Sequence, residues 1–389
     1  MRFFLTIVGF VAALVPAIAG AAGLTPAQVR GIEAAVSDGM TQRHIPSVVV
    51  RVDVDGAPVY QHAFGLRDLG NHVPASVSTN YQYGSITKQF TAAAILMLAQ
   101  DGKLSLDDRI GKWVPAFAKF PVTIRELLIH VSGIADFTSN EQYELKIGPL
   151  PFVGYEWGLN WAAARPLDFK PGTKAAYDNT GYVLLARVVE KASGKTFGRF
   201  LHDEIFQPLG MNGVRGFDML RIEPNVANGY IAWSQEFAQA NAGIQPAQQL
   251  DALVNAWAWN LRQVDGAGYL VGDAADLQRW DDALLAGKLL HGKWRDTFYR
   301  PGTLADGTPA YAGGDNKMKS RPTYCYGGLA KTQVQGVTVY GANGGTIGFL
   351  AFTATIPSKH MSVTILTNEG QIDNSKLTTP ILDALVESR

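Results

Sequence analysis

The chain has 389 residues, of which 47% are hydrophobic and 17% charged, a composition typical of a soluble globular enzyme with a large core. Its 34 Lys and Arg residues equal its 34 Asp and Glu residues, so no bulk charge favours binding to nucleic acid or to an anionic membrane surface. Cys325 is the only cysteine, which excludes an internal disulfide and a cysteine-based metal cluster.

Residues 1–22 differ in composition from the rest of the chain. Met1-Arg2 precedes a mostly apolar run, Phe3–Leu14, and then a stretch of small residues, Pro16–Ala22. A charged start, a short apolar run and small residues suited to cleavage are typical of a secretory signal. We therefore expect residues 1–22 to be a signal peptide, the protein to be secreted or periplasmic, and no membrane span to follow. An uncleaved membrane anchor is the alternative interpretation.

The first elements after this segment are a helix and a strand pair. Thr25-Pro26 is typical of an N-cap followed by proline at the first helical position, and it predicts a helix that ends at about Arg43. Ser47–Val54 and Val59–Phe64 are apolar or alternating, and the turn residues Asp55-Gly56-Ala57-Pro58 join them. This pattern predicts a β-hairpin.

The stretch that follows places Ser85 at the start of an apolar-faced helix, with Lys88 one turn later and Asp101-Gly102 as the stop signal. Residues three apart share a helix face, so the Lys88 amine can lie beside the Ser85 hydroxyl. Free backbone N–H groups at the helix start favour developing negative charge. A single Ser-x-x-Lys is weak evidence, because an ordinary helix-starting serine with a solvated lysine also matches it.

The middle of the chain, from Leu104 to about Lys293, is helical and rich in loops, and strands return after Tyr324. The clearest predicted helices are Thr123–His130, Tyr182–Ser193, Ala274–Leu285 and the final Leu377–Val386. The predicted C-terminal strands are Tyr324–Lys331, Val334–Tyr340, Phe349–Ile356 and Met361–Leu366.

Strands at both ends of the chain, with a helical block between them, predict a fold with an antiparallel sheet flanked by helices and an inserted helical domain. We expect residues 24–104 and 300–389 to form one discontinuous α/β domain and residues 105–299 to form the helical domain. A cleft between two such lobes is the expected ligand site.

Two further motifs carry groups suited to catalysis. Tyr177-Asp178-Asn179 places a phenol and an amide two residues apart on a turn; a packing tyrosine followed by an N-cap is the alternative. Tyr340–Phe349 contains Asn343, Gly344 and Gly345, and its glycines let the backbone approach a substrate so that N–H groups can stabilise an oxyanion. An ordinary glycine-rich hairpin turn is the alternative for that segment.

Ser-x-x-Lys, then Tyr-x-Asn, then a glycine-rich segment near the C-terminus, resembles the serine β-lactamase and penicillin-binding protein superfamily. The chain is most similar to the class C-related branch, which includes class C β-lactamases, D-peptidases and β-lactamase-like esterases. The resemblance covers the chain from about Leu24 to the end. The stretches that support it are Gly102–Asp108, Thr123–Ile134, Phe169–Asn179, Pro208–Met211 and Gly266–Trp280.

The resemblance implies a role for each motif residue. Ser85 is the nucleophile, and Lys88 with Tyr177 transfers protons, provided that burial and neighbouring charge lower their pKa values toward neutral. The N–H groups of Ser85 and Gly345 form the oxyanion hole, and Asn179 orients the substrate or Lys88. Asn343 and Gly344 complete the substrate-binding segment. No metal or organic cofactor is implied, and His130 is expected to be structural.

The third motif departs from the family pattern. Relatives carry Lys or His at the position of Ala342, followed by a small residue and Gly, so the usual cation is missing. A carboxylate in a half-buried cleft needs a charged partner, which puts penicillin-like and D-Ala-D-Ala-like substrates in doubt. Lys317, Arg321 or Lys331 are candidates to replace the cation from a neighbouring strand or loop.

The sequence therefore predicts an exported serine hydrolase that acts through an acyl-enzyme on an ester or amide, with a small-molecule or peptide substrate. A class C-like β-lactamase, or a D-Ala-D-Ala carboxypeptidase or D-aminopeptidase, is the alternative within enzymes. A non-catalytic binding protein that keeps the fold is the alternative outside them. The sequence leaves the oligomeric state open.

Overall fold

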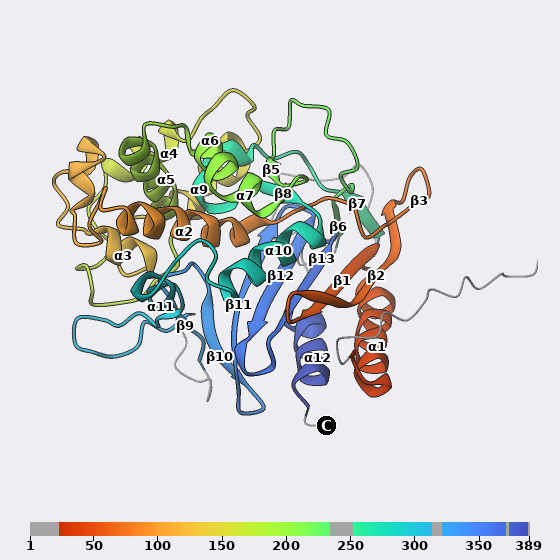
Figure 1. Ribbon diagram of the computed structural model, residues 1–389. Helices are drawn as coiled ribbons and strands as arrows, with labels where there is room; N and C mark the ends of the chain where they lie inside the picture. Colours follow the sequence, from red (N-terminus) through yellow and green to blue (C-terminus); the bar gives the residue numbers. More distant parts are fainter. Residues whose placement is uncertain (1–22, 234–251, 313–320, 371–372, 388–389) are drawn as a thin grey trace, which may run out of the picture.

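The computed structural model describes residues 23–233, 252–312, 321–370 and 373–387, so the predicted signal peptide, residues 1–22, lies outside the described part. Its main element is an eight-stranded antiparallel sheet in the order β3-β2-β1-β13-β12-β11-β10-β9 (Figure 1). The strands of this sheet are β1 (Ser47–Val54), β2 (Ala57–Asp68), β3 (Val73–Pro74), β9 (Thr323–Tyr324), β10 (Ala330–Val334), β11 (Val337–Thr346), β12 (Phe349–Ile356) and β13 (Met361–Thr367).

The two ends of the chain meet in the middle of this sheet. β1 pairs with β13 along its length, from Val48 opposite Thr367 to Val54 opposite Met361. Alternate side chains of a strand point to opposite faces, and β1 is buried on both. Val49 packs into the core on the side of the helical lobe, while Val50 packs into the core beneath α1 and α12.

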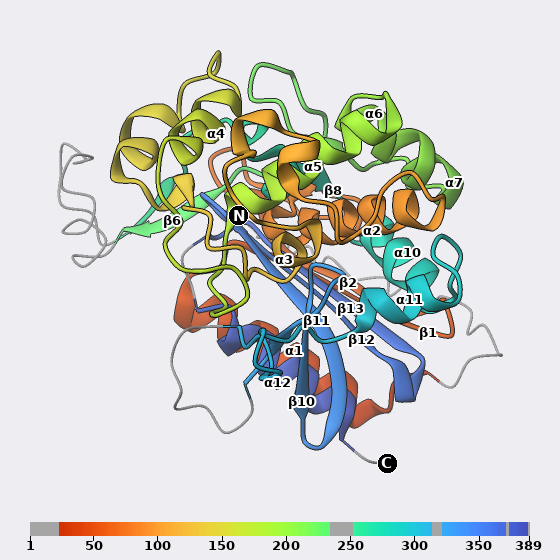
Figure 2. The same ribbon diagram turned by 90° about the vertical axis from the view of Figure 1, so that its left-hand side faces the viewer.

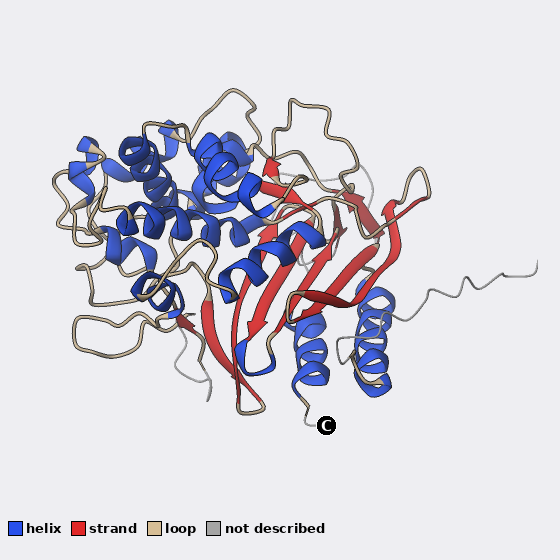
Figure 3. Cartoon of the chain, viewed as in Figure 1, coloured by secondary structure: helices blue, strands red, loops and turns tan. Residues whose placement is uncertain are grey.

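Helices cover both faces of the sheet, as Figures 2 and 3 show. α1 (Pro26–Arg43) and α12 (Ser375–Val386) lie side by side on one face, and a capping box of Thr25 and Gln28 begins α1. α10 (Ala274–Leu285) lies on the opposite face, against β1, β12 and β13. The sheet is therefore the middle layer of three.

The helical lobe is built around α2 (Thr87–Gln100) and α5 (Asn179–Ser193), which pack against each other. Nearly every side chain of α2 is buried. No helix among the described residues is long and apolar enough to cross a membrane. The other elements of the lobe and its borders are α3 (Ile124–Leu128), α4 (Glu156–Ala163), α6 (Phe197–Leu201), α7 (Gln207–Leu209), α9 (Asp265–Gly268), α11 (Lys293–Tyr299), β4 (Tyr81–Gln82), β5 (Arg215–Gly216), β6 (Tyr230–Trp233), β7 (Ala252–Asn255) and β8 (Leu270–Gly272).

The predicted fold class is confirmed, but two segments near the site differ from the expectation. The predicted strand Tyr324–Lys331 is wrong, because the chain turns after β9 and Gly328 adopts a φ of +69° before β10 begins. The predicted strand Val334–Tyr340 instead begins at Val337 and continues to Thr346 as β11, so Asn343, Gly344 and Gly345 lie within a strand and the hairpin-turn alternative for them is wrong. The turn comes later, at Gly348, with a φ of +85°. The domain boundaries stay a prediction.

Candidate active site

Ser85 lies on a short 3-10 turn, Gly84–Ile86, that leads directly into α2. Gly84 has a φ of +52°, and a Cβ added there would lie 2.7 Å from the backbone nitrogen of Gly345. A side chain at Gly344 would lie 1.9 Å from the carbonyl oxygen of Tyr83. The turn that carries Ser85 is therefore packed backbone to backbone against β11, and glycine is needed on both sides of the contact.

Lys88 projects from the first turn of α2 and is only 2% exposed. Its Nζ donates to three acceptors: Ser85 Oγ at 3.2 Å, Asn179 Oδ1 at 2.7 Å and the carbonyl oxygen of Ala267 at 2.8 Å. An ammonium group has three N–H donors, and a neutral amine has two and a lone pair. In the neutral form, Asn179 and Ala267 accept the two N–H groups, and the lone pair is left for the Ser85 hydroxyl.

Electrostatics favour this neutral form. Burial lowers the pKa of Lys88 from 10.5 to about 7, and the carboxylates of Asp136 and Asp178 oppose the shift. Burial and the neighbouring charge of Asp136 raise the pKa of Asp178 well above 3.8. Asp178 is therefore less readily ionised than an ordinary carboxyl group, and it opposes the fall in the Lys88 pKa less than a full negative charge would. A lysine with a pKa near 7 can accept a proton at neutral pH.

Tyr177 approaches Ser85 from the other side, and its hydroxyl donates to Ser85 Oγ at 2.6 Å. Tyr177 is 44% exposed, but enclosure of its hydroxyl end raises its pKa above the ordinary value of 10, and the hydrogen bond to Ser85 offsets only part of the rise. The expectation of a lowered tyrosine pKa is therefore wrong, because no cation near the phenol outweighs desolvation. Tyr177 is a phenol at neutral pH and can donate a proton but not take one.

Asn179 is held by groups on both sides. Asp178 caps α5 by accepting from the Gly181 N–H at 3.0 Å, which fixes Asn179 at the first position of the helix. The Asn179 amide donates to Thr138 Oγ1 at 2.8 Å and to Asp136 Oδ2 at 3.3 Å. These contacts orient its Oδ1 toward Lys88, so the structure places Asn179 as a partner of Lys88.

The His130 ring packs against the ring of Tyr177. Its Nδ1 accepts from the Asp178 N–H at 3.1 Å, which leaves the proton on Nε2. Burial, aided by the charge of Lys88, lowers the pKa of His130 to about 3, so the ring is neutral. The ring centroid lies 4.7 Å from that of Tyr177 and 4.6 Å from that of Tyr324. His130 thus packs against the ring of Tyr177 and touches neither Ser85 nor Lys88 by hydrogen bond.

The residues of the third motif point in alternating directions along β11. Gly344 faces the turn that carries Ser85, and the Gly345 backbone lies against Gly84. Ala342 shares the face of Gly344. Asn343 points to the other side of the strand, where its Oδ1 accepts from Asn374 Nδ2 at 2.9 Å. The structure therefore brings the Gly344 and Gly345 backbone to the turn that carries Ser85, and Ala342 and Asn343 line the cavity that begins at Ser85.

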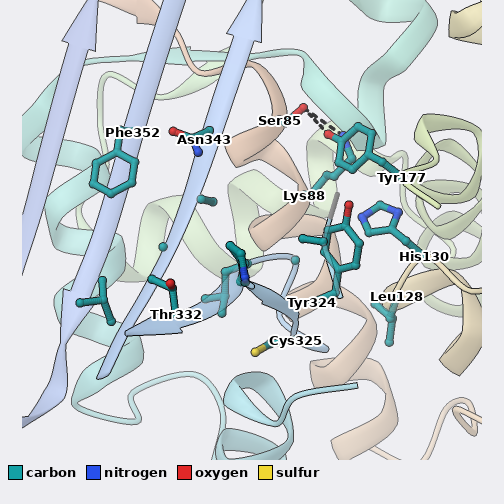
Figure 4. A pocket seen from close by; sticks show the side chains of 18 of the residues that line it. Ser85, Lys88, Leu128, His130, Tyr177, Tyr324, Cys325, Thr332, Asn343 and Phe352 are labelled. Atoms are coloured by element: carbon teal, nitrogen blue, oxygen red, sulfur yellow. Dashed lines mark hydrogen bonds between the residues drawn. The ribbon is translucent and has the colours of Figure 1, made fainter. Parts of the chain in front are cut away.

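A cavity of about 290 Å³ begins at Ser85, Lys88 and Tyr177 (Figure 4). Its wall continues through His130 and Tyr324 to Leu128, Cys325 and Leu329, and its far end reaches Thr332 and Phe352. Among its described lining residues, Lys88 is the only Lys or Arg, and there is no Asp or Glu.

The structure does not place the proposed replacement cations in this wall. Lys331 and Arg321 are not among its lining residues, and the Arg321 guanidinium lies over the ring of Tyr311, 4.7 Å from its centroid. Lys317 lies outside the described residues. Across the described residues, no group of three or more His, Cys, Asp or Glu side chains could hold a metal ion.

Sequence reasoning missed four residues that contribute to the site. The Ala267 carbonyl is a backbone acceptor, and any residue could supply it, so the sequence carries no signal for it. Asp136 and Thr138 orient Asn179 from a separate loop. Tyr324 was assigned to a continuous strand, although its position ahead of a Gly-Gly pair could have indicated the turn that faces the cavity.

Comparisons with known proteins agree with this geometry. Penicillin-binding protein 4* of Bacillus subtilis (strain 168) is 28% identical over 258 residues, which are 65% of this chain and 55% of that protein, so the chain spans about half the length of this curated relative. The octameric penicillin-binding protein homologue from Pyrococcus abyssi superposes with a TM-score of 0.77 at 27% identity, covering 92% of this chain and 77% of that one. A D-stereospecific amidohydrolase from Streptomyces sp. gives a TM-score of 0.70 at 25% identity, covering 90% and 96%.

The family model adds the widest match, since the model of the Beta-lactamase family covers residues 32–387. That span contains Ser85, Lys88, Tyr177 and Gly345, which the fold brings together at one end of α2. The chain therefore belongs to the Beta-lactamase family, within the superfamily of serine β-lactamases and penicillin-binding proteins.

Proposed function

We propose that this chain is an exported serine hydrolase that cleaves an ester or amide bond through an acyl-enzyme on Ser85. One observation carries the proposal: Ser85 Oγ lies between two proton-carrying groups, 3.2 Å from Lys88 Nζ and 2.6 Å from the Tyr177 hydroxyl. A hydroxyl nucleophile needs a base within hydrogen-bond reach, and a neutral Lys88 amine supplies it.

Acylation begins when Ser85 Oγ forms a bond to the substrate carbonyl carbon and its proton passes to the Lys88 amine. Negative charge develops on the carbonyl oxygen. The backbone N–H groups of Ser85, at the start of a helix, and of Gly345, on β11, are the donors for this charge. Each such donor contributes about 3 kcal/mol in comparable sites.

The tetrahedral intermediate then loses its leaving group. As the bond between carbon and the leaving atom breaks, the Tyr177 phenol gives its proton to that atom, and the proton held by Lys88 restores the phenol. The acyl-enzyme thus carries a neutral Lys88 and a neutral Tyr177. A water molecule replaces the leaving group in deacylation, with Lys88 again as the base.

The missing cation at Ala342 favours neutral substrates over carboxylate-bearing ones, because the described wall offers no ion partner other than Lys88. A D-amino acid amide or peptide is a second candidate substrate, since the Streptomyces neighbour is named a D-stereospecific amidohydrolase. Turnover of a p-nitrophenyl ester, a D-amino acid amide and nitrocefin, measured side by side, separates esterase, amidase and β-lactamase.

The direct test is intact-mass spectrometry after incubation with a fluorophosphonate. We expect one adduct on the wild type and none on Ser85→Ala, which deletes only the nucleophilic oxygen. Ser78→Ala is the matched control, because Ser78 lies on an exposed turn. An adduct on Ser85→Ala, or none on the wild type, would contradict the proposal.

Export has its own test. The mature protein should begin within residues 20–24 and be recovered outside the cytoplasm, which N-terminal sequencing of the secreted or periplasmic fraction measures. Material that begins at Met1 and stays with the membrane would support the anchor interpretation instead.

A further inference from the structure

The cavity beside Ser85 reaches the nucleophile from one side only. Ser85, Lys88 and Tyr177 form its inner end. Asn179, Gly344 and Gly345, which lie around the same serine, take no part in its wall among the described residues. The cavity therefore lies on the side of the Tyr177 hydroxyl, and along β11 it borders Gly341, Ala342 and Asn343, the residues just before the backbone donor segment.

The wall of this cavity is mostly apolar and aromatic, with Thr332 and Asn343 as polar residues. Leu128 is fully buried, Cys325 and Leu329 are 1% and 6% exposed, and the rings of Tyr324 and His130 complete the surface. His130 is neutral, as described above. Apart from Lys88, no described residue of the wall could pair with a charged group that entered this space and lost its hydration, whereas an apolar group would gain from leaving water.

One part of the wall, the turn between β9 and β10, packs against the catalytic helix. A Cβ added at Gly328 would lie 2.7 Å from the carbonyl oxygen of Lys88, so the turn after β9 packs directly on the backbone of α2. The Cys325 N–H donates to the Leu329 carbonyl at 2.8 Å, and the Gly327 N–H donates to the Phe298 carbonyl at 2.8 Å. This part of the wall is thus anchored to the backbone of the helix that carries Lys88.

We infer that this cavity binds the leaving group of the substrate, and that this leaving group is an uncharged, apolar alcohol or amine. The inference rests on the proposed function. Tyr177 must protonate the leaving atom, so that atom lies on the Tyr177 side of Ser85 Oγ while the carbonyl oxygen points to the Gly345 N–H. The rest of the leaving group then extends past Tyr177 into the cavity.

Two series of esters test the assignment. The first keeps an acetyl group and lengthens the alcohol, and the second keeps one alcohol and lengthens the acyl group. Leu329→Phe fills the cavity and Leu329→Ala enlarges it, while Leu290→Ala, at a buried core position outside the cavity wall, is the matched control. Fluorophosphonate titration counts active sites in each variant, so a poorly folded fraction does not distort the rates.

We expect Leu329→Phe to lower kcat/KM for the bulkiest acetate esters by at least about tenfold and Leu329→Ala to move the optimum to a longer alcohol. All acetates form the same acetyl-enzyme, so where deacylation limits turnover kcat should not change along the alcohol series. The acyl series should keep its profile. The inference would be overturned if the Leu329 variants changed kcat/KM only in the acyl series. It would also be overturned if they changed kcat/KM in neither series while all active sites were titrated. Neither result would contradict the proposed hydrolase activity.

A matched pair of leaving groups tests the charge. We expect kcat/KM for p-tolyl acetate to exceed that for 4-acetoxybenzoate by at least about tenfold, because the described wall offers the carboxylate no ion partner other than Lys88, the base at its inner end. Equal rates would overturn the claim of an uncharged leaving group. Absence of labelling and of all ester and amide turnover would instead contradict the proposed function itself.

Discussion

Replacing Lys88 with methionine should make the stability of the protein respond differently to pH. Lys88 is 2% exposed, and burial lowers its pKa from 10.5 to about 7. A fall of this size corresponds to about 5 kcal/mol for placing the charged form in the site. The methionine variant lacks the hydrogen bonds to Asn179 and Ala267 at every pH. It also avoids the unfavourable burial of a charged amine, but this advantage over the wild type exists only at a pH where the folded wild type carries the charge.

The sign follows from proton binding. Because the folded pKa lies below the unfolded one, the unfolded wild type holds a proton between about pH 7 and 10.5 that the folded protein does not. The free energy of unfolding of the wild type therefore rises with pH through this window. From pH 6 to pH 9, the stability of Lys88→Met relative to wild type should fall by about 3 kcal/mol.

Urea unfolding at pH 6 and pH 9 measures this difference, provided that the m-values of the two proteins agree. Lys112→Met is the matched control: the Lys112 side chain is 56% exposed and pairs with Asp108 at 2.8 Å, so its relative stability should not change over this range. A stability difference for Lys88→Met that is equal at both pH values would mean that Lys88 keeps an ordinary pKa, and the neutral-base mechanism would fall.

Three further changes test the site. Tyr177→Phe should lower kcat about 10²–10⁴-fold. The double variant Tyr177→Phe with Lys88→Ala should have a kcat little lower than that of the worse single variant, because the two residues act in one proton path. A double variant whose loss of kcat equals the product of the two single losses would contradict that path. Gly344→Ala should lower kcat per active site about 10²–10³-fold, because its Cβ would lie 1.9 Å from the Tyr83 carbonyl oxygen. Gly345→Ala should lower kcat less, because its Cβ would meet only the end of the Leu350 side chain, at 3.3 Å. A larger loss for Gly345→Ala than for Gly344→Ala would refute the proposed contact. Ala342→Lys should raise kcat/KM for a carboxylate-bearing β-lactam relative to a neutral ester, and an unchanged ratio would show that another group already serves the carboxylate.

Much of the site could be predicted because its side chains sit at the starts of helices. Capping residues, apolar spacing and stop signals locate such starts, and they predicted Ser85 and Lys88 on one face of a helix; Asn179, predicted on a turn, is the first residue of α5, as the alternative interpretation had it. The order of the three motifs along the chain, Ser-x-x-Lys, then Tyr-x-Asn, then the glycine-rich segment, then indicated the family. The fold class followed from the positions of the strands at the two ends of the sequence.

What the sequence did not predict depends on contacts between distant segments. The pKa of Tyr177 rises because the surrounding protein desolvates it, and no local pattern reports that. The glycines of β11 resemble a turn in sequence, yet they are needed because another backbone crosses the strand at Gly344. The turn after β9 was missed because Tyr324 and Cys325 continue an apolar run that fits a strand equally well.

The pairing of β1 with β13 determines when the site can form during synthesis. Gly345 lies on β11, which joins the central sheet through β12 and β13, and β13 is the strand that pairs with β1. Ser85 is made early, but its backbone partner is fixed only after the C-terminal strands have been made and have found β1. Contacts of such long sequence separation form slowly. A ribosome-bound chain that ends before β13 should therefore show no fluorophosphonate labelling, and the appearance of labelling marks completion of the sheet.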